Sequence, residues 1–73
     1  MPNIPKKIKT YEKRFGNIAV DKGFITPNEL IRALETQIQE EIDTGERQLI
    51  GQILLEQNAI TSDQIKEVLD ELF

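Results

Sequence analysis

The chain has 73 residues, 38% of them hydrophobic, which suits one small domain with a single modest core. The absence of cysteine and histidine excludes disulfide bonds, Cys/His zinc sites, thiol nucleophiles and Ser–His catalytic pairs. Residues 1–22 hold six cations and two acidic residues, which gives a net charge of +4. Residues 23–73 hold three cations and eleven acidic residues, which gives a net charge of −8. Such an acidic domain is a poor binder of DNA or RNA, and neither is expected as a partner.

The N-terminal residues 1–10 are predicted to form a flexible, extended basic arm, because they hold two prolines and three lysines and few apolar residues. Residues 11–73 are predicted to form a single helical domain. No stretch approaches the roughly 18 apolar residues that span a bilayer, and no apolar segment follows the lysines as in a secretory signal. We therefore expect no membrane insertion and a cytoplasmic location.

Two helices separated by a tight turn are predicted in the first half of the domain. Apolar residues at three- and four-residue spacing indicate a short helix over about 11–22, and Gly23 follows where a left-handed residue ends a helix. Thr26 and Glu29 have the spacing of a capping box around Pro27, so a second helix is expected from residue 27 to about Asp43, before a stop at Gly45. Its predicted apolar stripe comprises Leu30, Ala33, Leu34, Ile38 and Ile42.

The second half repeats this pattern at an offset of 35 residues. A short apolar helix is expected from about residue 50, Asn58 takes the place of the left-handed glycine, and Thr61 and Gln64 form a second capping box before a helix over about 62–72. The aligned pairs include Gly16 with Gly51, Ile18 with Ile53, Ile25 with Ile60, Thr26 with Thr61 and Leu34 with Leu69. We predict an all-α, compact four-helix domain built from two repeated helix–turn–helix hairpins. Repeat one covers about 14–37, a connector covers 38–48 and repeat two covers about 49–72.

Four residues are candidates for function, each with an alternative structural explanation. Gly16 and Gly51 fall inside predicted helices, where glycine costs about 1 kcal/mol relative to alanine. They allow either close packing, with the two glycines facing each other across the core, or the approach of a ligand to bare backbone. Arg14 is either a surface residue or a ligand for guanine or phosphate, and Gln37 is either an exposed amide or a reader of a base edge.

No catalytic or metal site is predicted. We interpret the acidic residues as solvated surface charges, without the partly buried context that shifts a carboxyl pKa. No glycine-rich phosphate-binding motif is present. We therefore expect the protein not to be an enzyme.

The first repeat resembles a 24-residue motif found in tandem in the N-terminal domain of type II secretion and type IV pilus assembly ATPases. The resemblance rests on Arg14-Phe15-Gly16, Ile18, Val20, Gly23, Phe24-Ile25, Leu30, Leu34 and Gln37. Some members, the MshEN-type domains, bind the bacterial second messenger cyclic di-GMP, and others dock the ATPase on its membrane platform. The resemblance covers residues 14–72 and excludes the catalytic domain.

A cyclic di-GMP site is what this resemblance implies. Its polar part would be Arg14, Gly16 and Gln37; Phe15, Ile18 and Gly23 would shape it; and Ile50 and Gly51 would remain from the second half. The second copy departs from the motif, because Leu49, Asn58 and Leu72 replace its arginine, glycine and glutamine. Each unmade hydrogen bond to a buried guanine costs on the order of 1–3 kcal/mol, so weakened binding is expected.

Two function classes follow from this reading. The first is a regulatory or adaptor module that binds cyclic di-GMP through the first motif and serves a secretion or pilus machine. The alternative is a protein docking domain without a nucleotide ligand, which predicts an exposed apolar patch near Leu72, Phe73 or the first helix. A helix-turn-helix nucleic-acid binder is disfavoured, because no basic recognition helix is present.

Overall fold

Four helices make up the computed structural model, which describes the backbone of residues 6–73 and the side chains from residue 12 onward. They are α1 (Lys6–Asp21), α2 (Pro27–Thr44), α3 (Ile50–Glu56) and α4 (Ser62–Leu72). Residues 6–73 contain no strand. The predicted all-α four-helix class is therefore confirmed.

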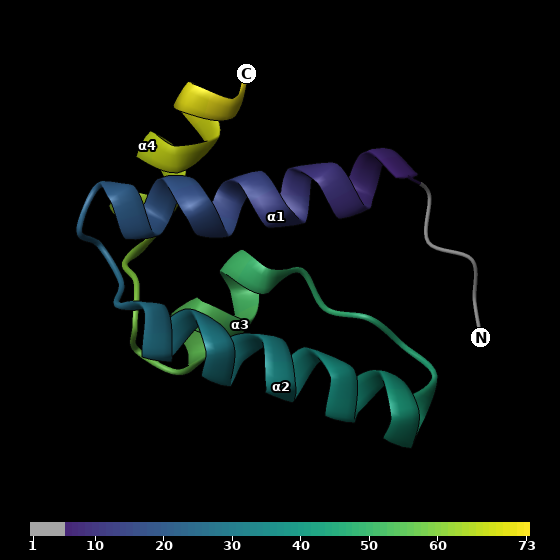
Figure 1. Cartoon of the computed structure of the whole chain (residues 1–73). Helices are drawn as coiled ribbons and strands as arrows, with labels where there is room; N and C mark the ends of the chain where they lie inside the picture. Colours follow the sequence, from purple (N-terminus) through teal and green to yellow (C-terminus); the bar gives the residue numbers. More distant parts are fainter. Residues whose placement is uncertain (1–5) are drawn as a thin grey trace.

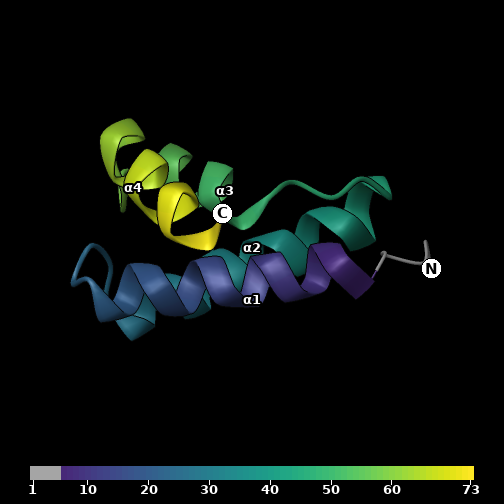
Figure 2. The ribbon, with the colours of Figure 1, turned by 90° about the horizontal axis from the view of Figure 1, so that it is seen from above.

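The helices pair into two hairpins that stack as two layers. The helices α1 and α2 run in opposite directions beside each other, with α3 behind them and α4 against α1 (Figure 1). Seen from above, α3 and α4 lie together on one side of the α1–α2 pair (Figure 2). A segment over residues 45–49 leads from the far end of α2 back to α3.

The start of α1 corrects one prediction. The helix begins at Lys6, five residues before the expected start, so residues 6–10 are helical rather than extended. The reason is local, since no proline or glycine follows Pro5 before Gly16, and lysine is a good helix former. The rest of the predicted arm, residues 1–5, lies outside the described residues.

The two turns have the same hydrogen-bond pattern, as the repeat predicts. In the first turn, the amide of Phe24 donates to the carbonyl of Ala19 at 3.0 Å, and Gly23 has φ 76°. In the second turn, the amide of Ala59 donates to the carbonyl of Leu54 at 2.9 Å, and Asn58 has φ 59°. A left-handed residue with this bond closes a Schellman motif, which orients each hairpin.

Both predicted capping boxes are confirmed. The amide of Glu29 donates to Thr26 Oγ1 at 3.1 Å, and the amide of Thr26 donates to Glu29 Oε1 at 2.8 Å. The amide of Gln64 donates to Thr61 Oγ1 at 3.1 Å, and Gln64 Oε1 accepts the amide of Thr61 at 3.0 Å. Each box satisfies two amide groups that a helix start leaves without partners, so α2 and α4 begin where the sequence places them.

One contiguous core lies between the two layers. Its buried members are Phe15, Ala19, Ile25, Ala33, Ile50, Ile53, Leu54, Ile60 and Val68. The turn residues Ile25 and Ile60, which the repeat aligns, are both buried in this core.

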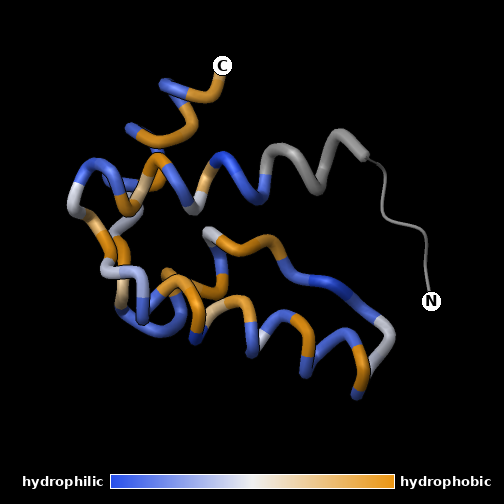
Figure 3. Tube along the Cα trace, in the orientation of Figure 1, coloured by the Kyte–Doolittle hydropathy of each residue, from blue (hydrophilic) through white to orange (hydrophobic). Residues whose placement is uncertain are grey.

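The predicted apolar stripe of α2 packs into the core at two of its five positions. Ala33 is buried and Leu30 packs against the core, but Leu34, Ile38 and Ile42 are exposed. Hydrophobic positions recur along the whole of α2 (Figure 3). However, Ile38 is exposed although its neighbour Gln37 is buried, and Ile31 in the N-terminal half is exposed as well, so these positions lie on a side of α2 that the neighbouring helices do not cover. Part of the apolar stripe is therefore left without cover from the described part of the chain.

Candidate functional site

An apolar groove with a volume of about 520 Å³ lies between α1, α3 and α4. It is lined by Glu12, Phe15, Leu49, Ile50, Gly51, Gln52, Leu55, Ile65, Leu69, Leu72 and Phe73. Several of these apolar side chains are exposed to solvent, among them Leu49 at 58% and Leu69 at 40%. The surface can therefore bury an apolar ligand or protein segment, and we call it the apolar groove.

The glycine at the floor of this groove is required by a close contact with an aromatic ring. A Cβ atom at Gly51 would lie 2.9 Å from Cζ of Phe15, and Phe15 is itself buried. The ring of Phe15 therefore occupies the space that a side chain at position 51 would need. The predicted residues Phe15, Ile50 and Gly51 come together here, in a packing role at the base of the groove.

A second hollow of about 300 Å³ lies between α1 and α2. It is lined by Glu12, Lys13, Gly16, Asn17, Leu30, Leu34, Gln37 and Arg47, and we call it the polar hollow. It unites Gly16 and Gln37, two of the three polar positions that the family resemblance implies. A Cβ at Gly16 would lie 2.8 Å from Cδ1 of Leu30, so the two helical glycines contact different side chains and do not pack on each other.

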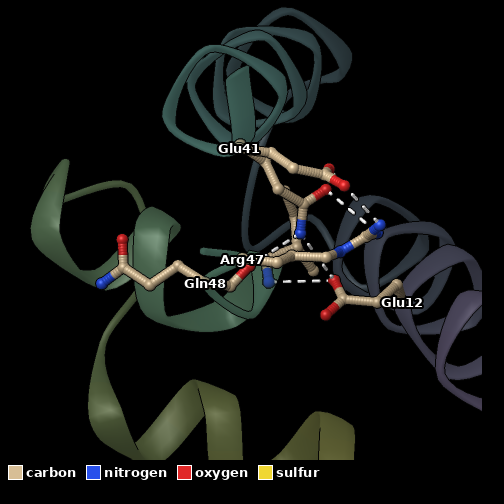
Figure 4. A network of polar contacts seen from close by, with 6 residues as sticks. Glu12, Glu41, Arg47 and Gln48 are labelled. Carbon is tan, nitrogen blue, oxygen red and sulfur yellow. Dashed lines mark hydrogen bonds and ion pairs between the residues drawn. The ribbon is translucent and has the colours of Figure 1, made fainter. Parts of the chain in front are cut away.

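The amide of Gln37 is held in a network of internal hydrogen bonds with Glu12, Arg47 and Gln48, which are the labelled residues around it together with Glu41 in Figure 4. Gln37 is buried, and its Nε2 donates to the carbonyl of Gln48 at 2.8 Å and to Glu12 Oε2 at 3.5 Å. Its Oε1 accepts from Arg47 Nη2 at 3.3 Å. A base edge would have to displace these partners, so the interpretation of Gln37 as an exposed amide is wrong and its role as a base reader requires rearrangement.

Glu12 joins α1 to the start of α3. The amide of Ile50 donates to Glu12 Oε2 at 2.9 Å, and α3 has no cap from its own N-cap side chain, Leu49. The carboxylate therefore satisfies an amide at the helix start from 38 positions away and places negative charge at its positive end. The other oxygen, Oε1, is buried and accepts no hydrogen bond from the described residues.

The linker residue Arg47 completes the network. Its Nη1 lies 4.0 Å from Glu41 Oε2, and its side chain also reaches Gln37. Arg47 lines the polar hollow together with Lys13, so two cationic side chains lie at this site.

The remaining predicted site residues are dispersed. Arg14 and Gly23 are exposed and line neither hollow, and Ile18 is half-buried against the core. A Cβ at Gly23 would meet nothing within 4 Å, so its positive φ alone explains the glycine. The structure thus divides the predicted half-site between a groove, a hollow and the open surface.

Sequence reasoning missed Glu12 and Arg47. A signal for Glu12 was present, because it precedes Phe15 by three residues and Gly16 by four and so lies on the buried face of its helix. Arg47 carried no such signal, since its position depends on the path of the linker.

Comparison with family models, with curated proteins and with solved structures gave no match. No helix among the described residues is long and apolar enough to cross a membrane, and no group of three metal-ligating side chains occurs among them. The likeness to secretion and pilus ATPase domains therefore stays a prediction from the motif residues.

Proposed function

We propose that this protein is a non-catalytic docking module whose apolar groove binds an apolar, positively flanked segment of a partner protein. The observation that carries the proposal is the groove itself, a hollow of about 520 Å³ whose lining is almost entirely apolar. Exposed apolar surface of this kind is typical of interaction sites. The docking hypothesis predicts an exposed apolar patch near the first helix or residues 72–73, and the groove is lined by residues from these places.

The shape of the groove favours a helical segment as occupant. Along one wall, α4 presents Ile65, Leu69 and Leu72 at helical spacing over an 11-residue helix about 16 Å long. That length matches about three turns of a partner helix. An amphipathic helix laid in an apolar groove is a common mode of peptide recognition.

The net charge of the C-terminal part of the chain favours a basic partner. Residues 50–73 hold five acidic side chains, all exposed, against the single cation Lys66. None of the five lines the groove, where Glu12 is the acidic residue, so this excess acts over the surface as a whole: it attracts a basic partner and raises the rate of association at low salt.

The expected affinity is modest. Four lining side chains are exposed by 38–81% and would be buried on binding, which contributes about 3–6 kcal/mol at about 1.5–3 kcal/mol for each fully buried side chain. The partner buries a similar apolar area, which about doubles the gain, and association entropy opposes it, so we expect a Kd of about 10 µM to 1 mM for a short segment. Such weak contacts suit an adaptor that works beside other contacts in a larger assembly.

The test uses a fluorescent amphipathic peptide of leucine and lysine, with fluorescence anisotropy as the readout. We expect saturable binding that is weakened at least about tenfold by Leu69→Asp, because a charge would be buried in the groove. Ile42→Asp is the matched control, since Ile42 is exposed on α2, away from the groove. Equal binding by both variants, or equal binding of a leucine–glutamate peptide, would refute the docking site.

Cyclic di-GMP binding is a second candidate function, and the polar hollow favours it. Lys13 and Arg47 are suited to a phosphate, Leu30 and Leu34 to the face of a base, and the unpartnered Oε1 of Glu12 to a guanine N–H. The engaged amide of Gln37 and the distance of Arg14 from the hollow's lining weigh against it, so we rank it below docking.

Titration with cyclic di-GMP distinguishes the two candidates. The ligand hypothesis predicts saturable binding that Arg47→Ala and Lys13→Ala weaken and that Leu69→Asp leaves unchanged. If no binding is seen at about 1 mM, where the binding free energy is no better than about −4 kcal/mol, the nucleotide candidate is refuted and docking is unaffected.

A further inference from the structure

The outer face of α2 carries an apolar stripe that the described chain leaves uncovered. Its members are Ile31, Leu34, Ile38 and Ile42, which we call the α2 stripe. Ile38 is 57% exposed and Ile42 73%, although isoleucine is among the residues most often buried. Only Ala33 and Gln37 of this 18-residue helix are buried. Apart from Leu34, the stripe lines neither hollow, so it is a surface distinct from the proposed docking groove.

The spacing of the α2 stripe is self-complementary for an antiparallel neighbour. Steps of three, four and four residues keep its members on one side of the helix. The midpoint between Ile31 and Ile42 falls between Thr36 and Gln37. A two-fold axis there sets Ile31 level with Ile42 of a second copy and Leu34 within one residue of the level of Ile38. A dimer with two-fold symmetry requires a patch that fits itself in this way.

The charges on α2 favour the antiparallel arrangement over the parallel one. Arg32 is the only cation on the helix, and Asp43 lies near its C-terminal end. Both are exposed, and an antiparallel pair brings Arg32 of each copy within two residues of the level of Asp43 in the other. A parallel pair would set like charges level along the helix, which is destabilising.

We propose that the α2 stripe is the interface of a symmetric dimer, in which α2 of one chain packs antiparallel against α2 of a second copy. The interface covers side chains that the fold leaves in water and keeps the apolar groove of each copy open. Each dimer would therefore present two docking grooves, which raises its avidity for a partner with two binding segments.

The first test is sedimentation equilibrium of the whole chain over a wide concentration range. We expect a reversible dimer that Ile38→Asp weakens at least about tenfold, because the two introduced carboxylates would meet near the two-fold axis. Leu69→Asp is the matched control, a charge placed on an exposed leucine of the groove, and should leave the dimer intact. Circular dichroism checks that both variants stay folded. A monomer at every concentration, or a dimer unaffected by Ile38→Asp, would overturn the proposal.

The antiparallel orientation of the two α2 helices is tested by disulfide cross-linking. Because the chain contains no native cysteine, any disulfide must form between the introduced cysteines. A mixture of Ile31→Cys and Ile42→Cys chains should form the mixed disulfide under mild oxidation, because the antiparallel pairing sets these positions level. Ile31→Cys alone should not cross-link, since its two copies lie about 16 Å apart along the helix axis, and a disulfide needs Cα atoms within about 7 Å. Efficient cross-linking of Ile31→Cys with itself would contradict the arrangement.

Discussion

Substituting alanine for each of the two helical glycines should have opposite effects on stability. Alanine in place of glycine inside a helix stabilises by about 1 kcal/mol. At Gly51 the new methyl group would lie 2.9 Å from Cζ of Phe15 and 3.3 Å from Cε1, against a ring that is buried in the core. Overpacking of this kind costs about 1–3 kcal/mol, so Gly51→Ala should be destabilised by up to about 2 kcal/mol.

At Gly16 the same substitution meets a neighbour that can move. The closest atom is Cδ1 of Leu30 at 2.8 Å, the end of a flexible side chain that is only half-buried. A rotamer change of Leu30 relieves the contact and leaves most of the helical gain. We expect Gly16→Ala to range from neutral to about 1 kcal/mol more stable than the parent chain.

Thermal unfolding followed by circular dichroism measures this difference directly. One kcal/mol corresponds to about 4–8 °C in a domain of this size, so Gly16→Ala should melt above Gly51→Ala by about that amount for each kcal/mol between them. Combining Gly51→Ala with Phe15→Leu should give a favourable coupling, because the smaller side chain vacates the contested space. If Gly51→Ala melts at or above Gly16→Ala, the packing explanation of Gly51 is refuted.

Three further predictions concern single interactions. Glu12→Ala should cost about 1–3 kcal/mol in urea denaturation, because the amide of Ile50 loses its acceptor, whereas Glu12→Gln keeps an acceptor oxygen and should lose less; equal losses would contradict this role. Thr61→Ala should cost about 1 kcal/mol through the lost cap, and Thr61→Ser, which keeps the hydroxyl, is the control. The hydrogen bond from Lys22 to Glu71 at 2.9 Å, together with the charge of that carboxylate, raises the pKa of Lys22 above its ordinary 10.5. The stabilisation from this pair is therefore present below pH 10.5 and lost as the pH rises through the raised pKa. Glu71→Gln should return the Lys22 pKa toward 10.5 in an NMR titration, and an unchanged value would exclude the pair as the cause.

The helix boundaries and turns could be predicted because their causes are local. A capping box needs residues three apart, and a left-handed turn needs glycine or asparagine at one position. Thr26, Thr61, Gly23 and Asn58 therefore defined three helix ends and two turns correctly. The start of α1 was placed too late because two prolines among residues 1–5 outweighed the helix-forming residues after them.

The coverage of α2 could not be predicted from its periodicity. Apolar spacing marks a helix face, but whether that face is buried depends on which side of the helix its neighbours cover. Here the neighbours of α2 cover the side that carries Ala33 and Gln37, and they leave Ile38 and Ile42 exposed. The exposed positions are the ones from which we infer the dimer interface.

The candidate site could be predicted only in part from the sequence, because some of its contacts join residues far apart in the chain. Helical spacing predicts that Gly16 and Gln37 lie on the facing sides of neighbouring helices, and they do line one hollow. The partners of Gln37, however, come from Glu12 and the carbonyl of Gln48, 25 and 11 residues away. Contacts of that range depend on the path of the linker, which no local pattern encodes. The apolar groove was likewise assembled from three helices.

The central claim is that the apolar groove is the binding surface of this protein. An NMR titration of the isotope-labelled chain with the leucine–lysine peptide tests it most directly, because amide shifts report every surface at once. We expect saturable shifts at Gly51, Leu69 and Leu72, with Gly16 and Asn17 unchanged. Shifts confined to the polar hollow, or no shifts at about 1 mM peptide, would contradict it.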